Sequence, residues 1–184
     1  MHAMTDTPTV YSLTRPHRHV RATDLATKLD GAKAFASQGS VRALAAVITV
    51  LVSARSALGG FGRGDLIAPV VSIAIVGPVE WIIHRHLLHA PAEAWTSRVL
   101  GLGTGHRQHH QHPVELRWLM LSWSEATIFV VLVGVVTAAW ALPLMWVIGA
   151  AVVGPFLTAW ACAAVGLLQY EWVHLLVHSR YRPT

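Results

Sequence analysis

Histidines are the residues of this chain whose type and spacing suit chemistry. Residues 80–113 hold seven of the twelve histidines: His84, His86, His89, His106, His109, His110 and His112. Neutral imidazole is the commonest protein ligand for transition metals, although histidines also sense pH or simply form polar surface. This density makes residues 80–113 the first candidate for a metal site.

Spacing along a helix decides which histidines can share one ion. On an α-helix, His106, His109 and His110 would span an arc of about 100°. His174 and His178 would lie about 40° apart on such a helix. Each of these two groups can therefore present its imidazoles to a single site.

The pair formed by His84 and His89 is harder to place. These residues would lie about 140° apart on an α-helix, so they suit different ions or a distorted helix end. His86 shares a face with His89 better than His84 does. We interpret His86 and His112 as surface residues, or as residues that contact the ligands and not the metal, because a polar side chain at a membrane surface needs no metal.

Two glutamates precede histidines at similar distances. Glu80 lies four residues before His84, and Glu171 lies three residues before His174. A carboxylate in this position can accept the second ring N–H of a metal-bound histidine, or it can simply reach the lipid headgroups. The sequence leaves both interpretations open.

Composition indicates that the elements carrying these histidines lie in a membrane. The chain has 54% hydrophobic and 12% charged residues, whereas soluble domains have about 25% charged residues. Apolar runs lie at residues 41–58, 66–83, 126–142 and 144–168. The last two approach or reach the roughly 20 residues that a span needs, and the first two would be short or tilted spans. We predict an all-α integral membrane protein with four transmembrane helices.

The connections between the runs predict two hairpins. Gly59, Gly60, Gly62 and Gly64 separate the first pair of runs, and Pro143 separates the second pair. Arg55 and Arg63 fall on the hairpin side, and the other twelve of the fourteen Lys and Arg residues fall on the opposite side. The positive-inside rule then places both termini and a histidine-rich cap in the cytoplasm.

The N-terminal residues differ in composition from the rest. We predict that residues 1–40 form a polar cytoplasmic arm with a short amphipathic helix over residues 22–36, and that residues 41–184 form the membrane domain. The net charge of +5 comes from scattered Lys and Arg residues, so we predict no nucleic-acid partner. Cys162 is the only cysteine, and we expect it to be a small buried apolar residue.

The ordered histidine groups, His84-x4-His89, His106-x2-His109-His110 and His174-x3-His178, resemble the histidine boxes of the fatty acid hydroxylase and sterol desaturase superfamily. The resemblance covers residues 66–184 and is greatest to the fatty acid 2-hydroxylase branch. It implies a centre of two iron ions, which zinc can replace in a purified sample, with seven ligands: His84, His89, His106, His109, His110, His174 and His178. It also implies O2-dependent hydroxylation or desaturation of a membrane lipid, with electrons from a separate cytochrome b5, ferredoxin or reductase.

The sequence departs from the family at its end. The family has a further His-x2-His-His box after the last pair, whereas this sequence ends six residues after His178. We therefore expect a fragment whose hydroxylase activity depends on residues beyond Thr184. The alternatives are a membrane protein that binds or transports metal ions and a non-catalytic remnant.

Overall fold

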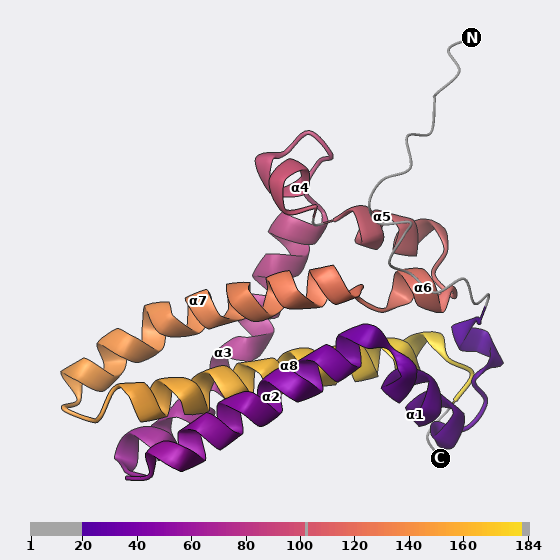
Figure 1. Cartoon of the computed structure of the whole chain (residues 1–184). Coiled ribbons are helices and arrows are strands. Elements are labelled where there is room, and N and C mark those ends of the chain that lie inside the picture. The colour runs from indigo at the N-terminus through magenta and orange to yellow at the C-terminus, as the bar shows by residue number, and fades with distance from the viewer. Residues whose placement is uncertain (1–19, 102, 182–184) are drawn as a thin grey trace.

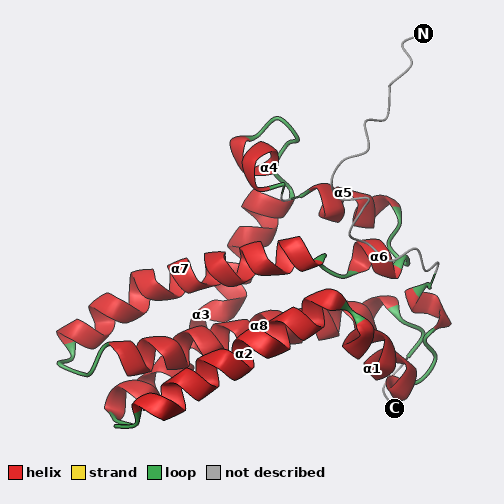
Figure 2. Cartoon of the chain, in the orientation of Figure 1, coloured by secondary structure: helices red, strands yellow, loops and turns green. Residues whose placement is uncertain are grey.

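The computed structural model describes residues 20–101 and 103–181, and this part of the chain contains helices and no strand. Four helices are long: α2 (Gly39–Leu58), α3 (Arg63–Ile83), α7 (Trp123–Val147) and α8 (Val153–His178). The short elements are η2 (Ala22–Asp24), α1 (Lys28–Ser37), the π-helix η3 (His84–Leu88), α4 (Trp95–Leu100), α5 (Thr104–Gln111) and α6 (Leu116–Leu119). Figure 2 shows how short the loops between them are. The all-α prediction is confirmed.

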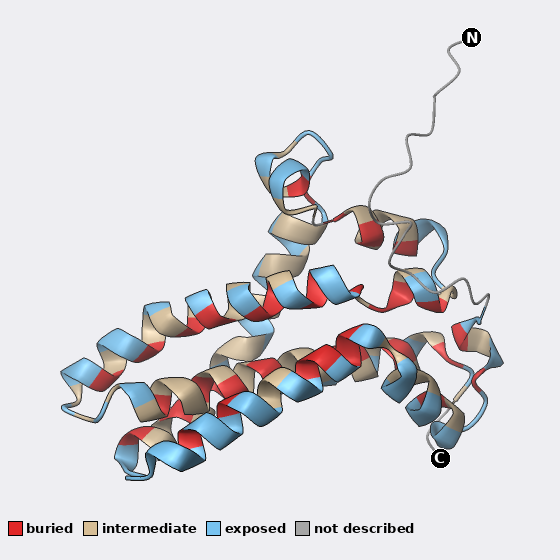
Figure 3. Ribbon diagram, viewed as in Figure 1, coloured by how far each residue is buried: buried red, intermediate tan, exposed pale blue. Residues whose placement is uncertain are grey.

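The long helices have the length and composition of membrane spans. The apolar helical stretches are Gly39–Leu58, Arg63–Leu88, Leu116–Val147 and Val153–His178, with mean hydropathies of 1.7, 2.1, 2.4 and 1.3. Exposed residues follow the outward faces of these helices (Figure 3), and many are apolar, among them Val70 and Val131. Such surfaces suit contact with lipid rather than water. The described residues thus form the four helices of a multi-pass membrane protein.

Helix α8 is the centre of the bundle and packs against α2, α3 and α7. Its buried positions include Ala159, Ala161 and Ala164, and small residues let neighbouring helices approach closely in a membrane. The turns after α2 and after α7 lie at one end of the bundle, and α1, α5 and α6 lie at the other (Figure 1). Each of the other three long helices thus packs against α8.

The turn after α2 falls where the glycines predict it, whereas the turn after α7 does not. Helix α7 continues through Pro143 to Val147, and the chain reverses over residues 148–152, where Gly149 has a φ of 61°. The predicted turn at Pro143 is therefore wrong. In an apolar span, continuing the helix satisfies the remaining backbone groups, and burial of Met145 against α3 and α8 favours the extra turn. The reversal then uses a glycine that tolerates a left-handed conformation.

Residues 20–40 pack on the histidine end of the bundle. The backbone N–H of Ala22 donates to Val114 at 2.7 Å, and Leu25 is buried with residues of α6 and α8. The Thr27 side chain accepts the N–H of Asp30 and so begins α1 at Lys28. The helix predicted over residues 22–36 is therefore divided in two. Residues 1–19 of the predicted arm lie outside the described residues.

Candidate metal centre

Three segments carry the candidate ligands to the same end of the bundle (Figure 1). The π-helix η3 continues α3 out of its span, α5 lies in the loop between α4 and α6, and the last turns of α8 approach from the other side. Ring contacts link η3 to α5 and α5 to α8. The three histidine boxes that are separate in the sequence therefore meet in space.

The π-helix explains how His84 and His89 reach one site. Its i→i+5 bond runs from the N–H of His89 to the carbonyl of His84, at 3.2 Å, so residues five apart come to lie on one face. The two rings lie 4.9 Å apart between centroids. His86 lies instead against Trp81, with 6.3 Å between ring centroids. The distorted helix end is thus present, and His86 lies outside the cluster.

A first group that can hold a metal ion consists of His84, His89 and His106, whose ligand atoms all lie within 4.8 Å of one another. The Nε2 atom of His89 is 3.1 Å from that of His84 and 3.2 Å from that of His106. His110 lies beside this group, with its Nε2 atom 3.0 Å from that of His106. Four imidazoles thus approach one another, each through its own Nε2 atom.

A shared metal ion explains these distances better than hydrogen bonds do. Two imidazole nitrogens bound at about 2.0–2.1 Å, with bond angles of about 90–110°, lie about 2.8–3.4 Å apart. Each of the measured separations falls in that interval. An imidazole nitrogen has one hydrogen or one lone pair, so Nε2 of His89 can make one good hydrogen bond and not two. The donor set therefore fits a transition metal.

A second group consists of His109, His174 and His178, again with ligand atoms within 4.8 Å of one another. The Nε2 atoms of His109 and His174 are 3.3 Å apart. The His109 ring lies 4.8 Å from each of the other two rings. His174 and His178 share a face of α8, as their spacing predicts. His109 lies on α5 with His106 and His110, so the triplet that its spacing assigned to a single site is divided between the two groups, and α5 joins them.

Two contacts fix α5 against η3. Gly103, just before α5, has a φ of 87°, and a Cβ atom there would lie 2.7 Å from the carbonyl oxygen of Leu88. The Arg107 guanidinium donates to the carbonyl of Ala90 at 3.0 Å and to the Thr104 hydroxyl at 3.2 Å. The ligands of α5 are therefore positioned by the close approach of Gly103 to the Leu88 carbonyl and by the hydrogen bonds of Arg107.

The surroundings keep the α5 ligands neutral. Burial, followed by repulsion from the neighbouring imidazoles, lowers the pKa of His106 to about 3 and that of His109 to about 4. A histidine must be neutral to bind a metal. Both side chains are thus in their ligand form at pH 7 without displacement of a proton.

The two glutamates singled out in the sequence take different places. Glu171 is buried, and its carboxylate accepts the backbone N–H of Leu121 at 3.0 Å, which fastens the start of α7 to α8. Glu80 lines a cavity below the histidines. Their predicted bonds to ligand histidines stay predictions.

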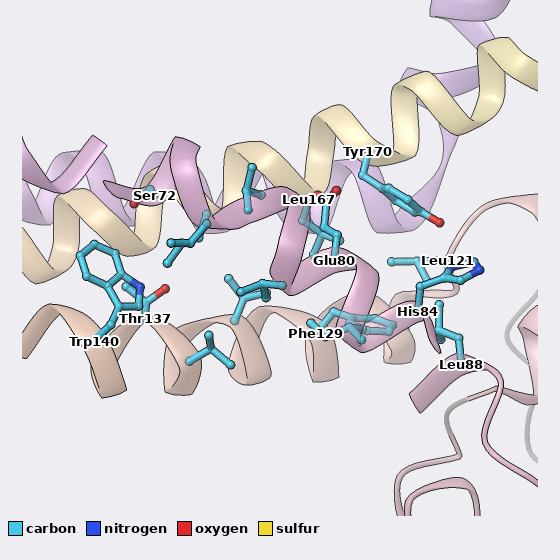
Figure 4. Close-up of a pocket in the computed structure, with 17 residues that line it drawn as sticks. Ser72, Glu80, His84, Leu88, Leu121, Phe129, Thr137, Trp140, Leu167 and Tyr170 are labelled. Atoms are coloured by element: carbon cyan, nitrogen blue, oxygen red, sulfur yellow. The ribbon is translucent and has the colours of Figure 1, made fainter. Parts of the chain in front are cut away.

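That cavity is apolar, has a volume of about 80 Å³ and lies between α3, α7 and α8. We call it the slot. Figure 4 shows His84 and Leu88 at one end and Trp140, Thr137 and Ser72 at the other. Twelve helical residues separate Ser72 from His84, which corresponds to about 18 Å. The slot residues come from three helices and left no motif in the sequence. Its lining is Ser72, Ile75, Val76, Val79, Glu80, Ile83, His84, Leu88, Leu121, Phe129, Val133, Val136, Thr137, Trp140, Ala163, Leu167 and Tyr170.

The geometry of this end of the bundle is thus two adjacent histidine groups above an apolar slot. Seven sequence-predicted ligands lie in or beside the groups, and His86 and His112 lie apart from both. Two histidine groups of this kind can hold two metal ions. Comparison of the chain with family models, with curated proteins and with solved structures finds no match.

Proposed function

We propose that this chain is a membrane-bound di-iron oxygenase that hydroxylates, or desaturates, a C–H bond of a lipid. The observation that carries the proposal is that His84 takes part in both the histidine cluster and the slot. This residue belongs to the first histidine group and also lines the slot. An aliphatic chain in the slot would therefore end beside a metal.

The distances between the histidine nitrogens divide the proposed ligands between two ions. His84, His89, His106 and His110 would hold one iron, and His109, His174 and His178 would hold the other. Iron that is bound by imidazoles and keeps open coordination positions would activate dioxygen. For hydroxylation the balance is R–H + O2 + 2 e⁻ + 2 H⁺ → R–OH + H2O. The two electrons come from a separate donor of the cytochrome b5, ferredoxin or reductase type.

The residues of the slot would bind the lipid, position it and exclude water. Val76, Val133 and Leu167 bury the acyl chain away from water, at about 0.8 kcal/mol for each methylene group. Holding that chain at a fixed depth brings one C–H bond close to the first histidine group, which raises the effective concentration of the reacting atoms. Leu88 and Leu121 at the histidine end keep water from the reacting carbon.

The proposal includes an orientation in the membrane. Trp123 and Trp146 are exposed near the two ends of α7, and their 23-residue separation corresponds to about 35 Å, which matches two interfacial aromatic belts. Arg55 and Arg63 lie near the turn at the other end from the histidines. With most Lys and Arg residues at the histidine end, the positive-inside rule places that end in the cytoplasm and the two short turns on the opposite face.

The test is loading of the purified full-length protein with Fe²⁺, followed by reaction with ¹⁸O2, a reductant and membrane lipid. We expect two irons per chain and one ¹⁸O atom in the hydroxylated product, detected by mass spectrometry. His84→Ala should lose iron and product, whereas the matched variant His86→Ala should retain both. Absence of bound iron, full activity of His84→Ala, or metal flux into vesicles without lipid oxidation would contradict the proposal.

A further inference from the structure

Two polar side chains lie in the slot near its histidine end. Glu80 of α3 and Tyr170 of α8 both line it, and Figure 4 shows them on the side of His84, away from Trp140. Neither the Glu80 carboxylate nor the Tyr170 hydroxyl makes a hydrogen bond to another described residue. A carboxylate inside a membrane span is costly and as a rule serves a ligand or an ion path. Partners for both groups are therefore to be expected from a molecule bound in the slot.

The two side chains hold corresponding positions below the two histidine groups. Glu80 is four residues before His84, and Tyr170 is four residues before His174. Four helical residues correspond to about 6 Å, so each polar side chain starts one turn further into the bundle than a candidate ligand. The Tyr170 ring lies 5.6 Å from the His174 ring between centroids, and an electrostatic interaction links Tyr170 to the Glu80 carboxylate. The pair thus lies between the apolar part of the slot and the histidines.

A pure hydrocarbon suits the slot poorly at this depth. It would leave both polar groups against methylenes without a hydrogen-bond partner, which is unfavourable. A carboxylate accepts hydrogen bonds, and a phenol can donate one. A hydroxyl or an amide has both a donor and an acceptor, so it can donate to Glu80 and accept from Tyr170 at the same time. The carboxylate of a free fatty acid offers no donor, and the charge of Glu80 would repel it.

We propose that Glu80 and Tyr170 are specificity-determining residues that hydrogen-bond one neutral polar group of the lipid, a hydroxyl or an amide, inside the slot. That group donates to the Glu80 carboxylate and accepts from the Tyr170 hydroxyl. The reacting carbon lies within a few bonds of the group, because one helical turn of about 6 Å separates the pair from the histidines. The inference rests on the lipid oxygenase proposed above and narrows its substrate.

Lipid binding without turnover tests this pair. The purified full-length protein is loaded with zinc in nanodiscs, and binding of a tritiated alkane, alcohol, secondary amide and carboxylate of equal chain length is measured against protein-free nanodiscs. We expect the alcohol or the amide to bind at least about 5-fold more tightly than the alkane, and the tighter of the two identifies the group. Glu80→Leu and Tyr170→Phe should each reduce this preference about 2- to 10-fold with zinc content unaltered. Gln169→Leu, the matched change at an exposed residue of α8 outside the slot, should leave the preference unaltered.

Several results would overturn the role of the pair. Equal affinities for the alkane, the alcohol and the amide would do so and would leave the slot as a lipid site. A preference that persists in both variants, or tightest binding of the carboxylate, would have the same meaning. Loss of zinc from Glu80→Leu would show that Glu80 supports His84 and not the lipid. Failure of all these lipids to bind would instead overturn the proposed lipid oxygenase, because the slot would then hold no substrate.

Discussion

Gly103→Ala should release α5 from the π-helix and so disturb both histidine groups, because α5 carries His106 of the first group and His109 of the second. Position 103 has a φ of 87°, and the added Cβ atom would lie 2.7 Å from the Leu88 carbonyl oxygen and 3.3 Å from that of Leu87. A left-handed conformation costs an L-residue about 1–2 kcal/mol. Relief of the backbone contact adds roughly 1–3 kcal/mol. The expected destabilisation is therefore about 2–5 kcal/mol, localised where α5 meets η3.

The assay combines thermal unfolding in detergent with metal content. Gly103→Ala should unfold at a lower temperature and bind less of both metals, because both groups take a ligand from α5. Gly77→Ala is the matched control, because Gly77 lies in α3 with no atom within 4 Å of its added Cβ. Alanine in a helix interior is neutral or stabilising by about 0.5–1 kcal/mol relative to glycine. Equal behaviour of the two variants would refute the view that a close approach at Gly103 positions the ligands.

Three further outcomes follow from the site. The folded pKa values of His106 and His109 are about 3 and 4, below the ordinary 6.5, so the unfolded chain binds more protons between these limits. The free energy of unfolding of the metal-free protein should therefore fall as the pH is lowered from about 6.5 to about 4, by up to about 1.4 kcal/mol per pH unit for each group; a flat denaturation profile would contradict this. Trp140→Ala enlarges the slot at the end away from His84 and should shift binding towards longer acyl chains with metal content unaltered; equal chain-length profiles would disprove that Trp140 limits the length of the bound chain. His178→Ala should lose one of two metals in elemental analysis while the exposed His112→Ala keeps both, and equal metal contents would exclude His178 as a ligand.

The sequence predicts the spans well because a membrane helix is defined by length and composition. The run at residues 41–58 nearly coincides with α2, and the run at 66–83 ends with α3 at Ile83. Pro143 misled the prediction of the second turn, since proline breaks helices in water. In an apolar span the neighbouring helices hold the chain helical past it, as the buried Met145 shows.

Spacing along one helix predicts only part of the site, because His109 lies on α5 with His106 but belongs to the other group. The spacing of His174 and His178 fixes a common face on α8, and the structure has both in one group. The slot could not be foreseen, because Phe129, Thr137 and Leu167 come from different helices and their approach depends on packing.

The two histidine pairs show that ligand spacing and helix type must agree. His174 and His178 are four residues apart on a regular α-helix, with 5.2 Å between ring centroids. His84 and His89 are five residues apart, and the π-turn brings their rings to 4.9 Å. The extra residue in the first pair is thus offset by the wider turn, and both pairs present similar ring separations. Since π-turns are rare and frequently found at functional sites, this turn fits the direction of both imidazoles at one site.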